Sequence, residues 1–223
     1  MSKDRNGEEI ALEARTATAA RMFSPSAARN RAPIAEVFLK YMPGSGTIVE
    51  VGSGTGEHVA HLAAAARSLS FLPGDPDEAS RASIAAWTAF HQLTNVAPPH
   101  AIDVATSGWQ AAFSPCEGVV SINMIHIAPF AAARGLIEGA AALLKPEGRL
   151  FLYGPFRRNG AHTAPSNEAF DASLKSRNPA WGVRDLDIEI IPLAAASGLS
   201  LVAIEEMPAN NLSVVFEKRL RAI

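Results

Sequence analysis

The chain has little cysteine and little net charge. Cys116 is its single cysteine among 223 residues, so no internal disulfide can form, which fits a reducing compartment or a fold that does not depend on redox conditions. The formal net charge is −2 and the isoelectric point is about 6.3, so the positive field that attracts nucleic acid is missing. We therefore expect a cytoplasmic protein without a nucleic-acid partner.

Long hydrophobic runs are missing too. The apolar stretch 119–133 is interrupted by Asn123, His126 and Pro129, and no run reaches the roughly 20 residues of a membrane-spanning helix. Residues 1–9 are polar and lack the apolar centre of a signal peptide. Because 48% of the residues are hydrophobic and 19% are charged, we expect a globular fold with a large core and no membrane partner.

Motifs for metal binding and for a serine nucleophile are absent from the sequence. His58 and His61 are spaced for one face of a helix, but no third ligand is evident and H-E-x-x-H does not occur. The segment 52–54, Gly-Ser-Gly, does not have the G-x-S-x-G form of a nucleophile elbow. We expect no metal centre.

A glycine-rich turn follows an apolar strand at residues 48–58, Ile-Val-Glu-Val-Gly-Ser-Gly-Thr-Gly-Glu-His. Glycine lets the backbone turn sharply and approach a ligand closely. A dinucleotide fingerprint would need glycine where Glu57 stands, and a P-loop would need Gly-Lys-Ser/Thr. Glu50 before the glycines would repel a pyrophosphate and suits a cation. The pattern E-x-G-x-G-x-G resembles the first motif of class I S-adenosylmethionine (SAM) methyltransferases; the alternative is a glycine-rich turn of another α/β protein.

Strands and helices are expected to alternate after this turn, which predicts an α/β fold with helices on both faces of a mostly parallel sheet. The predicted class is Rossmann-like, with seven strands and an antiparallel hairpin at the C-terminal end. The expected strands are 47–51, 69–73, about 100–104, 119–124, 149–154, 200–205 and 212–218, and the expected helices are about 55–66, 77–92, 130–144 and 185–196. We predict a flexible N-terminal segment, 1–23, and a single domain, 24–223, with a long polar insert at 155–182.

Acidic residues follow successive strands of the expected sheet, where ligands of such folds bind. A carboxylate at Asp75 can accept hydrogen bonds from both ribose hydroxyls of an adenosine. The methyltransferase resemblance implies that Glu50 lies close to the methionine part of SAM and that Asp103 contacts the adenine amino group. Each aspartate alone could equally be a turn former or a helix cap.

Further motifs resemble a group of methyltransferase-like proteins, long filed under a domain of unknown function, over roughly residues 24–218. These motifs are 24–30 (Ser-Pro-Ser-Ala-Ala-Arg-Asn), 122–126 (Ile-Asn-Met-Ile-His), 153–156 (Tyr-Gly-Pro-Phe), 162–167 (His-Thr-Ala-Pro-Ser-Asn), 181–185 (Trp-Gly-Val-Arg-Asp) and 207–211 (Met-Pro-Ala-Asn-Asn). The resemblance implies a class I fold and SAM binding but supplies no substrate. Gly74 departs from the serine expected before the aspartate, a small change that should leave the ribose contact intact.

The residues predicted to bind the cofactor include Asn30, from an N-terminal segment that could fold over the ligand as a lid or simply begin a helix. The full predicted cofactor set is Asn30, Glu50, Gly52, Ser53, Gly54, Asp75, Asp103, Val104 and Asn123.

His126 is the candidate catalytic base, because imidazole titrates near neutral pH and this residue lies just beyond a strand end. The alternative is a histidine that orients its loop. The predicted substrate residues are Tyr153, His162, Asn167, Trp181, Arg184, Asn210 and Asn211. Arg184 could hold a carboxylate or phosphate, or pair with Asp185 or Asp187. Trp181 could stack on substrate or pack in the core, and Asn210 and Asn211 could simply form a turn.

The sequence thus favours a SAM-dependent methyltransferase that acts on a small, polar, anionic metabolite and releases S-adenosylhomocysteine. A SAM-binding sensor or scaffold without transferase activity is the alternative, since no residue is decisively catalytic. A nicotinamide-dependent oxidoreductase shares the topology, but Glu57 at the third-glycine position argues against it.

Overall fold

The computed structural model describes residues 15–219, which fall into two compact units divided between Asp103 and Val104. Part of the predicted N-terminal segment, 1–14, lies outside the described residues, while residues 16–23 contain two short paired strands. The division into a flexible segment 1–23 and one domain 24–223 stays a prediction.

The first unit carries the glycine-rich turn between a strand and a helix, as expected. Its elements in chain order are β1 (Thr16–Thr18), β2 (Arg21–Phe23), α1 (Pro25–Tyr41), β3 (Gly46–Val51), α2 (Glu57–Ala65), β4 (Leu69–Gly74) and α3 (Glu78–Phe90). β3 and β4 pair in parallel, with Glu50 opposite Pro73. The Asp77 carboxylate caps α3 by accepting a 2.7 Å hydrogen bond from the Ser80 amide.

The strand predicted at about 100–104 does not form. Val96 and His100 make only isolated bridges, to Phe71 and Gly74 of β4. Pro98 and Pro99 stand between the two bridges, and proline has no N–H to donate to a ladder. The seven-strand expectation is therefore wrong: within the described residues the first unit contributes two of the expected strands and the second unit contributes four.

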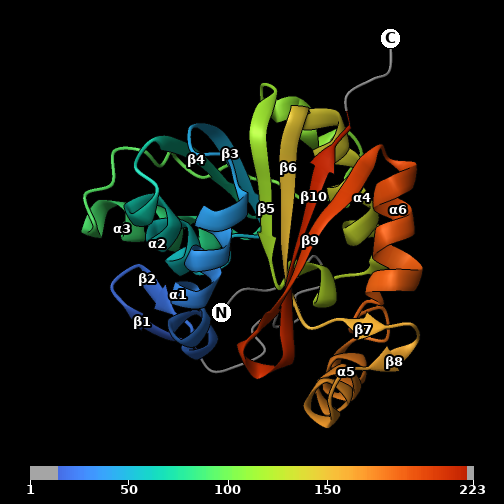
Figure 1. Cartoon of the computed structure of the whole chain (residues 1–223). Helices are drawn as coiled ribbons and strands as arrows, with labels where there is room; N and C mark the ends of the chain where they lie inside the picture. The colour runs from blue at the N-terminus through green and yellow to red at the C-terminus, as the bar shows by residue number, and fades with distance from the viewer. Residues whose placement is uncertain (1–14, 220–223) are drawn as a thin grey trace. The chain divides into compact units, whose positions relative to one another are not determined.

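The second unit contains four paired strands in the order β5–β6–β10–β9 (Figure 1). β5 (Cys116–Ile122) and β6 (Leu144–Gly154) are parallel, whereas β10 (Asn211–Lys218) is antiparallel to both β6 and β9 (Leu199–Met207). The predicted C-terminal antiparallel hairpin is thus confirmed. Val119, Leu150 and Val215 are completely buried, which is expected for strands covered on both faces.

Helices α4 (Phe130–Leu143) and α6 (Ile191–Ala196) pack against each other in the second unit. Short turns complete it: η1 (Trp109–Ala112), η2 (Met124–His126), a π-helical turn η3 (Leu186–Ile190) and η4 (Pro208–Asn210). Among the helices of residues 15–219, none is long and apolar enough to cross a membrane.

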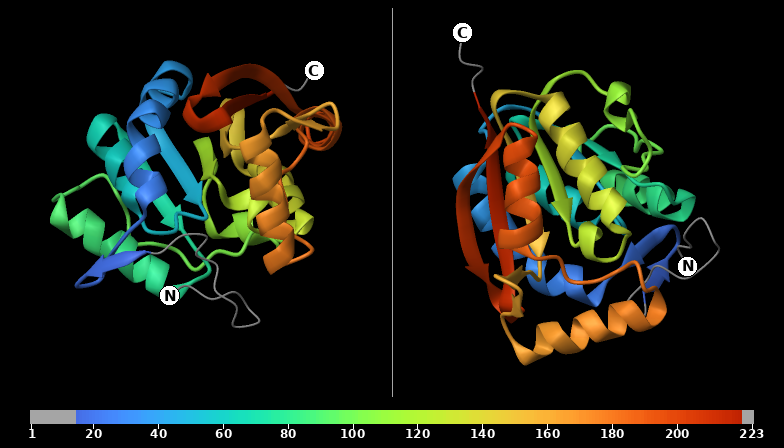
Figure 2. Two further views of the ribbon diagram at one scale, coloured as in Figure 1. Left: turned by 90° about the horizontal axis from the view of Figure 1, so that it is seen from below. Right: turned by 90° about the vertical axis from the view of Figure 1, so that its right-hand side faces the viewer.

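The polar insert after β6 is ordered. It forms a small hairpin, β7 (Arg157–Arg158) and β8 (Ala161–His162), followed by α5 (Pro165–Arg177). Figures 1 and 2 show these elements at the end of the second unit where β5 and β6 terminate. In a parallel sheet this carboxyl edge is where ligands bind.

Candidate functional site

The glycine-rich loop of the first unit is held by the aspartate that follows β4. Gly52, Gly54 and Gly56 have φ values of 67°, 56° and 86°, a region that favours glycine. The Gly54 amide donates to Asp75 Oδ2 at 2.9 Å, and the Asp77 amide donates to Oδ1 at 3.0 Å. Asp75 therefore fixes the loop through backbone hydrogen bonds.

Close packing also explains one of these glycines. A Cβ atom on Gly56 would lie 2.7 Å from the Ile84 Cα of α3, so only glycine lets the loop and the helix approach this closely. The Ser53 amide donates to the Gly74 carbonyl at 3.1 Å, which joins the ends of β3 and β4.

Glu50 is buried beside this loop and incompletely satisfied. Its side chain is 2% exposed, and Oε2 has no hydrogen-bond partner among the described residues. Burial raises the pKa of Glu50 from 4.5 to about 8, and the charge of Asp75 adds to this rise while Ser53 opposes it. A cationic group would stabilise the charged form of this carboxyl, so the residues present fit the positively charged SAM.

Asp75 has a similar environment but better partners. It is 8% exposed, and burial raises its pKa against the lowering effect of the Asp77 and Gly54 amides. The two carboxyl groups are the acidic side chains expected at the ends of β3 and β4, and the first unit places both next to Ser53 and the glycines.

Asn30 lies in α1 and its side chain is engaged with α2. Asn30 Oδ1 and His58 Nε2 are 2.8 Å apart. Burial, together with the charges of His61 and Arg31, lowers the pKa of His58 to about 4, so this imidazole is neutral at physiological pH and donates from Nε2. The contact joins α1 to α2, and a cofactor role for Asn30 stays a prediction.

A cavity of about 110 Å³ lies among α1, α2 and α3. Arg31, Glu57, Ala60, His61, Ala64, Trp87 and His91 line it. None of the predicted cofactor residues belongs to this lining. No group of three or more potential ligands that could hold a metal ion occurs within residues 15–219.

Asp103 and Val104 lie on the irregular segment that replaces the expected strand. Asp103 is the last residue of the first unit, and Val104 is the first residue of the second. The Val104 carbonyl would lie 2.0 Å from a Cβ on Gly135, which explains the glycine in α4. Contacts of Asp103 and Val104 with a cofactor stay predictions.

His126 lies in the turn η2 of the second unit, and Asn123, with a φ of 61°, connects β5 to this turn. Its Nδ1 accepts a hydrogen bond from the Arg184 amide at 3.2 Å, and its carbonyl accepts one from the Gly182 amide at 3.0 Å. The ring meets Phe156 edge-on at a centroid distance of 5.0 Å.

This arrangement determines which ring nitrogen of His126 carries the proton. Burial lowers its pKa to about 3, aided by the charge of Arg184, so the ring is neutral at physiological pH. Because Nδ1 accepts a hydrogen bond, the proton resides on Nε2, which has no partner among the described residues. A ring that presents N–H is a donor, which favours the loop-orienting interpretation over a general base.

Arg184 clamps the turn that contains His126. The side chain is 8% exposed, and its Nε donates to the Ile125 carbonyl at 3.0 Å. Nη2 donates to the carbonyls of Ala128 and Ala180. The predicted alternative of a pairing with Asp185 or Asp187 is not observed, and Asp187 instead pairs with Arg158. Anion binding by Arg184 stays a prediction.

Asn167 and Asn210 join α5 to the turn between β9 and β10. Asn167 Nδ2 donates to Thr163 Oγ1 and to the Asn210 carbonyl, both at 2.9 Å. Asn210 Nδ2 is 3.1 Å from Ser166 Oγ. Asn211 Nδ2 donates to the Pro208 carbonyl at 3.1 Å, so this residue stabilises its own turn.

Tyr153 and Trp181 are core residues by burial, at 2% and 4% exposure, and Trp181 thus follows the packing alternative. His162 is partly exposed and places Nε2 3.5 Å from Asp171 Oδ2. Sequence reasoning missed Asp171, which also accepts from the Val183 amide at 2.7 Å. Because Asp171 lies in the polar insert without a motif of its own, only the folded contacts reveal it.

Residues 21–218 match the model of a family described as "Protein of unknown function (DUF938)". The chain belongs to this family. The match covers the whole of the segment, roughly 24–218, over which the motifs resemble a methyltransferase-like group.

Solved methyltransferase structures share the fold of this DUF938 chain. One is an O-methyltransferase family protein from Burkholderia thailandensis, with a TM-score of 0.72 and 15% identity, over 86% of this chain and 57% of that chain. Another is the O-methyltransferase NcsB1 from neocarzinostatin biosynthesis, in complex with SAM and 2-hydroxy-5-methyl naphthoic acid, with a TM-score of 0.69 and 18% identity, over 87% of this chain and 55% of that chain.

A third is CalO1, a methyltransferase in calicheamicin biosynthesis in its SAH-bound form, with a TM-score of 0.66 and 17% identity, over 86% of this chain and 54% of that chain. The DUF938 chain thus spans somewhat more than half the length of these proteins. At these identities the likeness shows the fold, which is the Rossmann-like methyltransferase fold that the sequence predicts.

Proposed function

We propose that this DUF938 chain is a SAM-dependent methyltransferase that acts on a small, polar, anionic metabolite. The observation that carries the proposal is the buried carboxyl of Glu50, whose Oε2 has no partner, beside a glycine loop fixed by Asp75. A cation that supplies the missing interaction would remove the cost of burying this carboxylate.

The proposed roles follow the chemistry of each side chain. Glu50 would attract the positively charged methionine part, and Asp75 would accept from the ribose hydroxyls while keeping its loop bonds. SAM supplies an activated methyl group on a sulfonium, so the protein has mainly to orient the acceptor and exclude water. The remaining predicted cofactor residues, Asn30, Asp103, Val104 and Asn123, complete the proposed set.

His126 fits a donor role in this proposal. Its buried Nε2–H can hydrogen-bond an acceptor oxygen and hold that oxygen in place. A proton that leaves the acceptor would need another base, since the Nδ1 lone pair is occupied by the Arg184 amide. We retain Tyr153, His162, Asn167, Trp181, Arg184, Asn210 and Asn211 as proposed substrate-side residues, most of which act through packing and hydrogen bonds in the described structure.

A SAM-binding sensor or scaffold is the second candidate. It is favoured by the same observation on His126, because Nδ1 of this residue already accepts a hydrogen bond and its Nε2 carries the proton. Turnover to S-adenosylhomocysteine above background with any acceptor would exclude this candidate.

The deciding experiment is calorimetric titration of the purified chain, cleared of co-purified ligand, with SAM, S-adenosylhomocysteine and NAD. We expect SAM and S-adenosylhomocysteine to bind and NAD not to bind. Absence of binding by both sulfur compounds would contradict the proposal, whereas tight NAD binding would favour the oxidoreductase hypothesis.

A further inference from the structure

The two neighbouring arginines of the hairpin β7–β8, Arg157 and Arg158, lie on its opposite faces. Arg157 lies opposite His162, and Arg158 lies opposite Ala161. Successive residues of a strand point to opposite sides, while directly opposed residues share a side. Arg157 and His162 therefore share one face of the hairpin, and Arg158 lies on the other.

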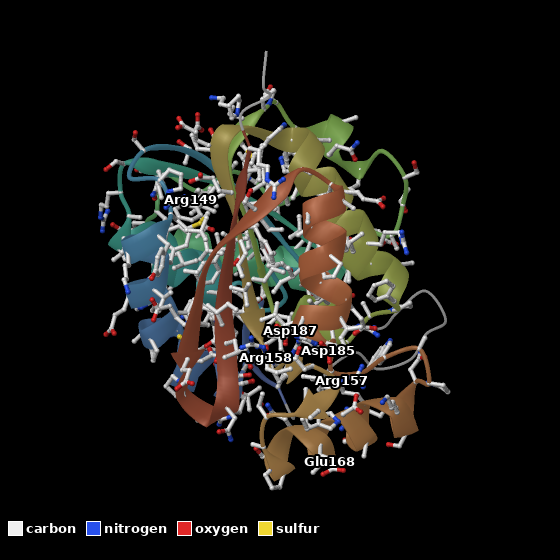
Figure 3. All side chains as sticks on the ribbon, turned by 45° about the vertical axis from the view of Figure 1, so that its right-hand side comes forward. Arg149, Arg157, Arg158, Glu168, Asp185 and Asp187 are labelled. Carbon is white, nitrogen blue, oxygen red and sulfur yellow. The ribbon has the colours of Figure 1, made fainter. Side chains whose placement is uncertain are left out.

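Arg158 is fully matched by an acidic partner. Its Nε and Nη2 donate to the two oxygens of Asp187 at 2.7 and 3.0 Å, a bidentate arrangement that raises the pKa of Arg158. Asp185 is used as well, because its carboxylate accepts from the amides of Gly160, Asp187 and Ile188. Figure 3 shows Arg157, Arg158, Asp185 and Asp187 close together near the end of α6.

Arg157 lacks such a match. Its Nε is buried and has no hydrogen-bond partner among the described residues, and its Nη2 is 3.7 Å from Glu189 Oε2, beyond hydrogen-bond distance. The same Glu189 oxygen already accepts from the Asp185 amide at 2.6 Å. The guanidinium group of Arg157 therefore has N–H donors that make no hydrogen bond to Glu189.

His162, on the same face, is also incompletely satisfied. Its Nδ1 is buried without a hydrogen-bond partner among the described residues, and its Nε2 faces Asp171 at 3.5 Å. Asp171 is already engaged by the Lys175 ammonium at 2.6 Å and by the Val183 amide at 2.7 Å. Arg157 Nε and His162 Nδ1 therefore lack hydrogen-bond partners, although both side chains lie within ion-pair distance of a carboxylate that other donors already occupy.

Arg184 adds positive charge to this region. Burial lowers its pKa, and the nearby charge of Arg157 lowers it further, against the raising effects of Glu189 and Asp171. Charges of both signs therefore lie close together here, since Arg157 is near Glu189, Arg158 pairs with Asp187 and Lys175 pairs with Asp171. The case for a bound ligand rests on the nitrogen atoms that lack hydrogen-bond partners and on their shared face.

We propose that Arg157 and His162 form a binding site for the carboxylate of the methyl acceptor. The guanidinium fork matches the two oxygens of a carboxylate, and His162 adds a second nitrogen from the same face. The inference rests on the proposed function for the identity of the acceptor, and it narrows the anionic substrate class to carboxylic acids.

The test is calorimetric titration of the full chain, saturated with S-adenosylhomocysteine, with 2-hydroxybenzoate, phenol and inorganic phosphate. We expect 2-hydroxybenzoate to bind, with at least a tenfold loss of affinity in Arg157→Gln and in His162→Gln. Arg158→Gln is the matched control on the opposite face and should bind as the wild type does. Arg157→Lys keeps the charge but loses the fork, so it should also bind more weakly.

Several results would overturn the site. These are equal affinity in wild type and Arg157→Gln, an equal loss in Arg158→Gln, or no binding by wild type at roughly 10 mM 2-hydroxybenzoate. Phenol binding as tightly as 2-hydroxybenzoate, or tighter binding of phosphate, would overturn the carboxylate assignment. Melting temperatures identify any variant that fails to fold. If Arg157→Gln does not fold, the affinity of Arg157→Lys for 2-hydroxybenzoate is compared with that of the wild type instead.

The same titrations separate this inference from the proposed function. If S-adenosylhomocysteine binds and 2-hydroxybenzoate does not, the carboxylate site is wrong and the proposed function stands. If S-adenosylhomocysteine does not bind but Arg157-dependent binding of 2-hydroxybenzoate is seen, the proposed function fails and the site stands.

Discussion

Glu50 shows how a single side chain depends on its surroundings. A carboxyl that is 2% exposed and lacks a partner on Oε2 remains protonated up to about pH 8, unlike a glutamate in water. Its neighbour Asp75 is also buried but accepts two backbone hydrogen bonds. The two carboxyl groups should therefore respond differently to substitution and to pH.

Replacing Asp75 by alanine should weaken SAM binding by about 2–4 kcal/mol, the scale of a lost charged bidentate contact. The reason is that the variant loses the proposed ribose contact and also the carboxylate that holds the Gly54 amide. Calorimetry would measure the change.

The control for Asp75 is Asp77→Ala, which removes the cap of α3 and leaves the Gly54 contact in place. It should lower the free energy of unfolding by about 1 kcal/mol without weakening SAM binding. Unchanged SAM affinity in Asp75→Ala would refute the ribose assignment.

The affinity for SAM should rise with pH up to about 8 and level off above it, because binding a cation requires Glu50 to release the proton that it holds below that pH. Calorimetry across this range in buffers of different ionisation enthalpy would detect the released proton. The Glu50→Gln variant should bind SAM more weakly. Its SAM affinity should also lose the pH dependence caused by Glu50, so any pH dependence that remains comes from titration of SAM itself or of other groups.

The same residue affects the ligand-free protein with a defined sign. Between pH 4.5 and about 8 the folded state holds a proton on Glu50 that the unfolded chain has released, so the free energy of unfolding falls as pH rises through this window. Glu50→Gln should remove that slope. An identical slope in both proteins would contradict the raised pKa.

At the level of elements, the second unit is held together at its carboxyl edge by polar side chains. Arg184 binds three carbonyls around η2, Asn167 joins α5 to the turn after β9, and Asp171 joins α5 to the Val183 amide. These contacts tie the insert to the rest of the second unit, while Arg157 Nε and His162 Nδ1 remain buried without hydrogen-bond partners.

Asn167→Ala should detach α5 from the β9–β10 turn. The variant loses two hydrogen bonds and leaves the Asn210 carbonyl without its partner, so we expect a loss of about 1–3 kcal/mol and faster amide exchange in α5. Ser176→Ala, an exposed change in the same helix, should have an effect within about 0.5 kcal/mol. Equal exchange in the two variants would mean that this contact does not hold α5.

Gly154→Ala should disturb the contact between the end of β6 and η2. A Cβ atom there would lie 2.6 Å from His126 Nε2, so the ring or the strand has to move, at a cost of about 1–3 kcal/mol in the free energy of unfolding. Denaturant unfolding would measure the loss. Gly44→Ala is the matched control, since no atom lies within 4 Å of a Cβ at that position. Equal stability of the two variants would argue against the close packing of His126.

At the level of the whole molecule, the chain has the methyltransferase fold, in little more than half the length of the similar solved structures. The fold leaves the substrate open, because unrelated reactions can share one architecture. Cofactor binding therefore needs a direct measurement on the intact chain.

S-Adenosylhomocysteine at about 100 times its dissociation constant should stabilise the chain by about 2.7 kcal/mol, through binding to the folded state alone. For a chain of this size the melting temperature should rise by several degrees, at about 2–4 °C per kcal/mol. NAD at the same concentration is the control and should give no rise. A rise with NAD alone would favour the oxidoreductase hypothesis.

Local patterns in the sequence determined most of the elements, including the glycine-rich loop between β3 and α2, while the roles of the site residues stay predictions. The apolar run before Gly52 predicted β3 and the loop, and hydrophobic spacing placed α4 and the C-terminal hairpin within a few residues. These features depend on residues that are near one another in the chain, so spacing alone reveals them. The strand expected at about 100–104 did not form: its segment bridges to β4 only at Val96 and His100, and Pro98 and Pro99 between these bridges have no N–H for a continuous ladder.

Only the tertiary structure decided which side chains, distant in sequence, become hydrogen-bond or ion-pair partners. The proton of His126 is placed by the Arg184 amide, Arg184 is occupied by carbonyls instead of acids, and Arg157 is left incompletely matched while adjacent Arg158 is paired. Each outcome depends on burial and on partners from other elements. A charge pattern along the chain does not contain this information, because the energy of a polar group is set by what surrounds it after folding.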